Sequence, residues 1–143
     1  MQIRQVISSQ STAKDLSLYH VVNDLIQESA QFAAHNRNYI VNNIPAALCI
    51  ETNETIVSAV VIKLLYTVIR NTQNSVILIS AKAYGTTVLL QVKSNGSISP
   101  GLPEEIGYAC MDAQKTGGII EMIHCESVQA SVAYCFLNVS GAA

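Results

Sequence analysis

The chain is organised around residues 56–95, which read IVSAVVIKLLYTVIRNT at 56–72, VILISAK at 76–82 and TVLLQVK at 87–93. In the first segment, apolar residues cover most of the circumference of a helix, so the pattern predicts a central helix over residues 54–71. The other two segments are rich in β-branched residues. The tight-turn signal Ala83-Tyr84-Gly85-Thr86 separates them, so they predict an antiparallel hairpin. A helix this apolar packs between a sheet and another helix.

The composition indicates one compact domain. Of its 143 residues, 50% are hydrophobic and only 13% are charged, against about 25% charged in a typical globular protein. This length is enough for one buried core, so we expect a single domain over residues 1–143. The low charged fraction argues against disorder and predicts an exposed apolar patch that binds a partner.

Charge and hydropathy exclude two classes of partner. The net charge is −2 and there is no basic cluster, so we expect no nucleic-acid partner. No apolar run approaches the ~20 residues of a membrane span, so we expect no membrane partner. The start of the chain lacks the apolar segment of a signal peptide. The cysteines lie far apart without CxxC spacing, as free thiols in a reducing compartment do, so we expect a cytoplasmic protein. They are Cys49, Cys110, Cys125 and Cys135.

The flanking sequence supplies the other elements. Asp15 or Ser17 can cap a helix with a buried stripe, and Gly117-Gly118 ends a second helix that begins near Pro103. The composition of residues 95–103 predicts a loop. The remaining expected elements are an edge strand at 3–8, a helix at 18–35, a strand at 39–41, a short edge strand at 47–50, a helix at 103–115, and a hairpin of strands 119–125 and 131–139.

This order of elements predicts the fold class. Strands and helices alternate, but hairpins occur where a parallel sheet would need crossovers. We therefore expect an α/β protein of the α+β kind: a two-layer α/β sandwich with a mixed, mostly antiparallel sheet and three helices on one face.

Three local patterns on this framework resemble a known family. KLLYTVIRNT at 63–72 stands where the family has N-L-L-x-N-A-x-x-x-T, VKSNGSI at 92–98 where it has V-x-D-N-G-x-G-I, and GGIIE at 117–121 where it has G-G-x-I-x. Together with the order of elements, they make nearly the whole chain similar to the ATP-binding domain of the histidine-kinase-like ATPases, the superfamily of gyrase B and MutL. The resemblance implies that fold and a role in bacterial signalling.

The positions that bind Mg²⁺ in the family differ in this chain. The resemblance places Lys63 and Thr67 where the family has the asparagines that hold Mg²⁺ between the phosphates. A charged lysine cannot ligate a cation, and a threonine hydroxyl is a weaker ligand than this hard cation prefers.

The adenine-binding positions are altered as well. Ser94 stands where the family has an aspartate that accepts a hydrogen bond from the adenine amino group, and it offers one short hydroxyl in place of a carboxylate. Asn95 and Gly96 match the family pattern. Ile98 replaces the next glycine, and its branched side chain intrudes where backbone must approach the base.

The phosphate-binding segment departs from the family too. The family has a long lid here and a glycine-rich segment whose N–H groups, at a helix N-terminus, bind phosphate. In this chain residues 96–103 are too few for the lid, and the glycines would fall near Pro103, Glu104 and Glu105. Proline has no N–H to offer, and the two carboxylates would repel a triphosphate.

Together these departures predict a nucleotide site that has lost its chemistry. We expect no catalytic residue, no metal site and no bound ATP or Mg²⁺, and the prediction leans against enzymatic activity. His20, His35 and His124 carry no metal-binding or phosphoacceptor pattern. The vestigial pocket is expected to comprise Lys63, Thr67, Arg70, Asn71, Ser94, Asn95, Gly96 and Ile98.

Three functions are open at this point. The first is a catalytically inactive histidine-kinase-like domain that acts as a protein-interaction or regulatory module in signal transduction, with another protein or a second copy as its partner. The second is a domain that binds a small molecule, nucleotides included, in the remodelled pocket near Lys63, Arg70 and Asn71. The third is a working ATPase or anti-sigma-type kinase with an atypical site.

Overall fold

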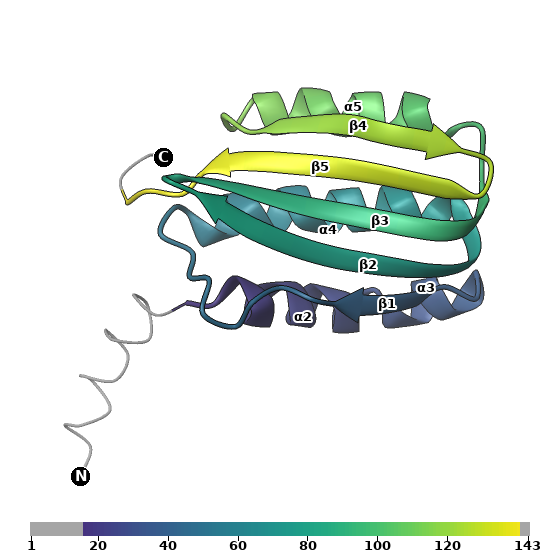
Figure 1. The fold of residues 1–143 in the computed structure, drawn as a ribbon, viewed down its shortest axis with the longest axis horizontal. Coiled ribbons are helices and arrows are strands. Elements are labelled where there is room, and N and C mark those ends of the chain that lie inside the picture. The colour runs from purple at the N-terminus through teal and green to yellow at the C-terminus, as the bar shows by residue number, and fades with distance from the viewer. Residues whose placement is uncertain (1–15, 141–143) are drawn as a thin grey trace, which may run out of the picture.

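The computed structural model describes residues 16–140, which form a five-stranded sheet with the described helices on one face (Figure 1). The strand order is β1-β2-β3-β5-β4. The first pair, β1 with β2, is parallel and the other pairs are antiparallel. The strands are β1 (Tyr39–Asn42), β2 (Thr72–Tyr84), β3 (Thr87–Ile98), β4 (Ile119–Glu126) and β5 (Gln129–Leu137). The helices are α2 (Leu18–Glu28), α3 (Ala30–His35), α4 (Glu54–Arg70) and α5 (Leu102–Gln114). The predicted two-layer sandwich with a mixed, mostly antiparallel sheet is confirmed.

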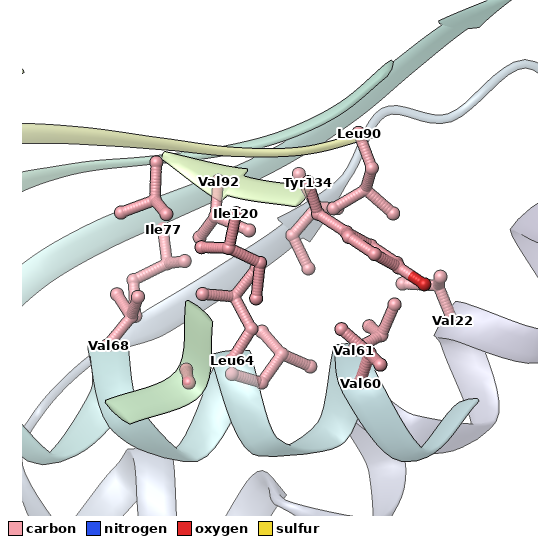
Figure 2. Packing of buried hydrophobic residues seen from close by; sticks show 14 of the residues in the cluster. Val22, Val60, Val61, Leu64, Val68, Ile77, Leu90, Val92, Ile120 and Tyr134 are labelled. Atoms are coloured by element: carbon pink, nitrogen blue, oxygen red, sulfur yellow. The ribbon is translucent and has the colours of Figure 1, made fainter. Parts of the chain in front are cut away.

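The central helix α4 lies in the middle of the helical layer (Figure 1). It begins at a side-chain cap, because the Asn53 oxygen accepts hydrogen bonds from the N–H groups of Thr55 and Ile56, at 2.9 and 3.3 Å. Its buried stripe packs against the inner face of the sheet, as Figure 2 shows for Val60, Val61, Leu64 and Val68 opposite Ile77, Leu90, Val92, Ile120 and Tyr134. Among residues 16–140, no helix is both long and apolar enough to cross a bilayer.

The helix predicted over residues 18–35 is two helices in the structure, so residues 16–140 contribute four helices to the helical layer where the sequence predicted three. The break falls at Ser29, whose side chain is fully buried. Its hydroxyl donates to the carbonyl oxygens of Leu25 and Ile26, at 3.0 and 3.2 Å. Such side-chain bonds compete with the backbone ladder of a helix and bend it. The break therefore separates α2 from α3.

The short strand predicted at residues 47–50 was wrong. The structure has only an isolated antiparallel bridge between Ser17 and Cys49. The N–H of Leu48 donates back to the carbonyl of Pro45, at 3.2 Å, and this turn leaves too little extended backbone for a strand. The edge strand predicted at 3–8 lies outside the described residues.

The loop predicted over residues 95–103 was also mostly wrong, because β3 continues to Ile98 and only residues 99–101 connect it to α5. The extension pairs with β2 across a bulge between Gln73 and Val76. It is also tied to the β4–β5 turn, since the N–H of Gly96 donates to Val128 and that of Ile98 to Ser127, at 3.1 and 2.9 Å. A loop-like composition thus becomes a strand through its tertiary partners.

Candidate functional site

The stripe of α4 that faces α5 carries the predicted pocket residues Lys63, Thr67, Arg70 and Asn71, which are spaced at one and two helical turns. The two helices pack directly against each other. They run antiparallel, since Lys63 of α4 lies beside Asp112 near the end of α5, and Arg70 at the end of α4 lies beside Glu105 near the start of α5. We call this contact, with the side chains that bridge it, the α4–α5 seam. It places these four predicted residues in one region of the molecule.

Two ion pairs bridge the seam. The Lys63 ammonium pairs with the Asp112 carboxylate. The Arg70 guanidinium donates from Nε and Nη2 to Oε1 of Glu105, at 3.1 and 2.7 Å. The hydrogen bond from Arg70 holds the pKa of Glu105 below its usual value, and the hydrogen bond from Lys63 does the same for the pKa of Asp112. Both cations on the α4 stripe are therefore paired with carboxylates of α5.

Two polar side chains next to these ion pairs, Thr67 and the C-cap residue Asn71, bond to the backbone of α4. Thr67 is buried, and its hydroxyl donates to the carbonyl oxygen of Lys63, at 2.8 Å. Asn71 is also buried, and its amide donates to the carbonyl oxygen of Thr67, at 2.8 Å. The hydroxyl and the amide that stand in the stripe are thus used within α4.

Ser94 and Ile98 lie on the inner face of the sheet, under the helices. Ser94 is buried, and its hydroxyl has no hydrogen-bond partner among residues 16–140. Ile98, Leu102 and Ile106 all belong to the buried apolar core. Branched side chains therefore fill the region between the end of β3 and the start of α5.

Asn95 and Gly96 contact the backbone of β2 and not the α4–α5 seam. The Asn95 side-chain oxygen accepts from the N–H of Val76, at 3.0 Å, where β2 bulges. Gly96 has a φ of 125°, and a Cβ at this position would lie 2.7 Å from the carbonyl oxygen of Asn74. The structure thus separates these two from the residues of the α4 stripe.

The N-terminus of α5 has few free N–H groups. The N–H of Gly101 donates to the Ser99 hydroxyl and that of Leu102 to the Ser99 carbonyl, both at 3.1 Å. Pro103 has no N–H. Glu104 and Glu105 occupy the first turn, where the helix dipole favours negative charge.

A cavity of about 360 Å³ opens beside Lys63, between the first half of α4 and the second half of α5. Its walls are mostly small and apolar, with Ile56, Ala59, Val60 and Ala109 among them. Within residues 16–140, no group of three or more histidines, cysteines, aspartates and glutamates lies close enough together to hold a metal ion.

No protein-family model and no curated protein matches the sequence. Solved structures do match it. A nucleotide-free catalytic domain of the histidine kinase ThkA aligns with a TM-score of 0.70 and 18% identity, over 87% of this chain and 94% of that domain. The chain has the histidine-kinase catalytic-domain fold. This confirms the fold that the resemblance implied.

Other histidine kinases align similarly. AdeS of Acinetobacter baumannii gives a TM-score of 0.70 at 12% identity, over 86% of this chain and 66% of that one. Full-length ShkA, solved in complex with AMPPNP, gives 0.69 at 14% identity, over 90% of this chain and 32% of that one. ThkA in complex with the response regulator protein TrrA gives 0.66 at 16% identity, over 87% of this chain and 41% of that one.

Within this fold, the sequence reasoning missed Asp112 and the partnership of Glu105 with Arg70. A signal was present, because Lys63 and Arg70 lie two turns apart on one predicted helix, and Glu105 and Asp112 lie two turns apart on the next. Two such pairs of opposite charge match across an antiparallel helix crossing.

The seam predicts a small, pH-dependent contribution to stability. Because the pKa values of Glu105 and Asp112 are lowered in the folded state, their contribution is present above their usual values of 4.5 and 3.8 and is lost as the pH falls through the folded values. Exposed ion pairs such as Arg70–Glu105 contribute about 0 to 1 kcal/mol. We expect Glu105→Gln/Asp112→Asn to lower the melting temperature slightly at neutral pH and not at all in strong acid.

Thermal melts across this pH range measure the difference. Glu104→Gln is the matched control, since Glu104 lies beside Glu105 on α5 and forms no ion pair with any residue from 16 to 140. A double variant that melts like the wild type at neutral pH and low salt would show that the ion pairs do not hold the seam.

Proposed function

We propose that the chain is a histidine-kinase-type domain without nucleotide chemistry, which acts as a protein-interaction module in signal transduction. One observation carries the proposal: the polar side chains on the α4 stripe are engaged within the protein. Lys63 and Arg70 pair with α5, and Thr67 and Asn71 bond to α4 itself.

The donor set of the seam does not suit Mg²⁺. This ion takes near-octahedral oxygen ligands at about 2.0–2.1 Å, from one or two carboxylates with waters and substrate phosphates. The carboxylates at the seam, Glu105 and Asp112, each face a cation of α4. A metal ion that binds Glu105 or Asp112 would have to displace the Arg70 or Lys63 side chain. The α4 stripe would then offer it no second carboxylate. The residues present therefore do not fit a Mg²⁺ site.

The positions that would bind adenine and phosphate also lack suitable groups. The Ser94 hydroxyl, at the position of the adenine-binding carboxylate, is enclosed in the core. The start of α5, where phosphate would bind, carries a proline and two glutamates. Together these features favour a domain that keeps the kinase fold for protein contacts.

The context of the fold supports a protein partner. ThkA, a protein that contains this fold, has been solved in complex with a response regulator. We propose a signalling protein or a second copy as the partner of this chain. The cytoplasmic location and the single domain expected from the sequence belong to the same proposal.

Isothermal titration calorimetry with ATP and Mg²⁺ tests the loss of nucleotide binding. We expect no saturable heat from the wild type. ShkA, which binds AMPPNP in its structure, provides a positive control in the same buffer. A saturable isotherm that disappears when Mg²⁺ is omitted would contradict the proposal and favour a working kinase with an atypical site.

The cavity beside Lys63 favours a second candidate, a domain that binds a small molecule. About 360 Å³ of mostly apolar space is enough for a compact ligand, and pockets of roughly 300 Å³ or more commonly hold one. Native mass spectrometry of the purified protein separates the two functions. A retained small-molecule mass supports the ligand-binding domain, and the bare polypeptide mass argues against it.

A further inference from the structure

The face of the sheet that points away from the helices is covered by no element of residues 16–140, and Figure 1 looks directly onto it. We call this surface the open face; it comprises the outward-pointing side chains of β1 to β5. Most of the exposed large apolar side chains of the described chain lie on it, with exposed fractions from 45% to 69%. They are Tyr39, Val76, Tyr84, Ile119, Ile123 and Leu137. This concentration matches the apolar patch that the composition predicted.

The open face is also hollowed along β5. The three outward residues in the middle of this strand, Ser131, Ala133 and Cys135, are small. Ala133 is only 4% exposed although nothing described covers it, because larger side chains flank it. A depression of about 530 Å³ lies at the Gln129–Ser131 end of the strand, between Val76 and Leu78 on one side and Ile123 on the other. The face therefore has both apolar projections and a hollow that can receive them.

Charges on the open face are divided by sign across the sheet. Lys82 and Lys93 project from β2 and β3, on one side of β5. Glu121 and Glu126 project from β4, on the other side, where His124 Nε2 lies 3.5 Å from Glu126 Oε2. The basic half and the acidic half thus lie side by side, with the strands running between them.

We propose that the open face is a self-association surface, on which a second copy of the chain packs face to face. The two-fold axis would run parallel to the strands, near the boundary of β3 and β5. A rotation about this axis exchanges the two halves of the face, so the basic half of each copy lies over the acidic half of the other. Sheets that pack in this way are about 10 Å apart, which lysine and glutamate side chains can bridge.

The size of the face suits such a dimer. Strands of about nine residues are roughly 30 Å long, and four neighbouring strands span about 20 Å, so the face presents on the order of 600 Å² per copy. Specific interfaces bury about 800 Å² per partner. Two such faces would bury on the order of 1,200 Å² in total, which is the lower end of the range for specific interfaces, so the open face suits a modest, reversible dimer.

This inference names the surface of the interaction role proposed above and rests on that role, but it does not depend on the state of the α4–α5 seam. The seam lies on the helical side of the sheet, opposite the open face (Figure 1). Nucleotide titration tests the seam, and measurements of association test the open face. Either proposal can fail while the other holds.

Sedimentation equilibrium or light scattering across a concentration series measures the association. We expect the wild type to dimerise reversibly and Ile123→Lys to raise the dissociation constant about tenfold or more, because it removes an apolar contact and sets a positive charge against the basic half of the second copy. Met111→Lys is the matched control, because Met111 is 60% exposed on α5, away from the open face. Both side chains are exposed, so both variants should melt like the wild type. A wild type that stays monomeric at its highest soluble concentration would overturn the proposal, and so would a dimer that Ile123→Lys leaves intact.

Charge exchange tests the arrangement of the copies. Lys82→Glu/Lys93→Glu makes the face acidic throughout, and Glu121→Lys/Glu126→Lys makes it basic throughout. Each double variant alone should be monomeric, because like charges then oppose each other, and an equimolar mixture should form a mixed dimer. If the mixture stays monomeric while the wild type dimerises, the proposed axis is wrong.

Discussion

Replacing Leu64 with alanine is expected to lower the free energy of unfolding by about 2 to 5 kcal/mol. Leu64 is fully buried in the middle of α4 and points into the core between the helix and the sheet (Figure 2). Alanine favours the helix more than leucine does, so the loss comes from the cavity and from the missing apolar contacts. Urea unfolding followed by circular dichroism measures the change.

Met111→Ala is the control for this prediction. Met111 lies in α5 with 60% of its side chain exposed, and its truncation should change stability by less than about 0.5 kcal/mol. Equal effects at the two positions would mean that α4 is not the centre of the core.

Replacing Gly96 with alanine is expected to destabilise the fold by about 1 to 3 kcal/mol. The backbone at Gly96 has a φ of 125°, and an added Cβ would lie within 2.9 Å of three backbone atoms of the β2 bulge. These atoms belong to the strand and cannot rotate away as a flexible side chain would. The variant should therefore unfold at a lower temperature and loosen the end of β3.

For Gly107 we expect the opposite effect of an alanine substitution on stability. It lies on the exposed side of α5, and a Cβ there meets nothing within 4 Å. Gly107→Ala should stabilise the protein by about 0.5 to 1 kcal/mol, because alanine loses less backbone entropy in a helix. Thermal melts of the two variants should thus shift in opposite directions. A neutral Gly96→Ala would show that β3 does not continue through this position.

Hydrophobic periodicity predicted correctly those helices and strands whose buried and exposed sides follow a regular pattern in their own sequence. The apolar circumference of residues 56–69 gave the central helix, and alternation around a short turn gave each hairpin. The order of these elements was enough for the sandwich and for its kinase-type fold, which the structural matches confirm. Local pattern and tertiary structure agree at these places, as they do in most of a natural sequence.

The errors arose where a distant partner decides the local structure. Asn95-Gly96-Ser97 has the composition of a loop, but the β4–β5 turn and the bulge in β2 supply strand partners. Ser29 breaks a helix that its apolar pattern would continue, because its buried hydroxyl bonds to the preceding turn. Neither partner is visible in the sequence around the residue.

The site could be predicted in part. The alignment with the family brought Lys63, Thr67, Arg70 and Asn71 together on one stripe, and the structure places them there, facing α5. It could not show that Glu105 and Asp112 pair with this stripe, because the crossing of two helices is set by the whole core. The loss of nucleotide chemistry stays a prediction that measurement must test.

The most direct test follows the amide resonances of ¹⁵N-labelled protein during titration with ATP and Mg²⁺. We expect the amides of Lys63, Thr67, Asn71 and Ser94 to keep their chemical shifts up to millimolar nucleotide. Saturable shifts confined to these residues and to the first turn of α5 would contradict this expectation, because they would place a nucleotide in the seam.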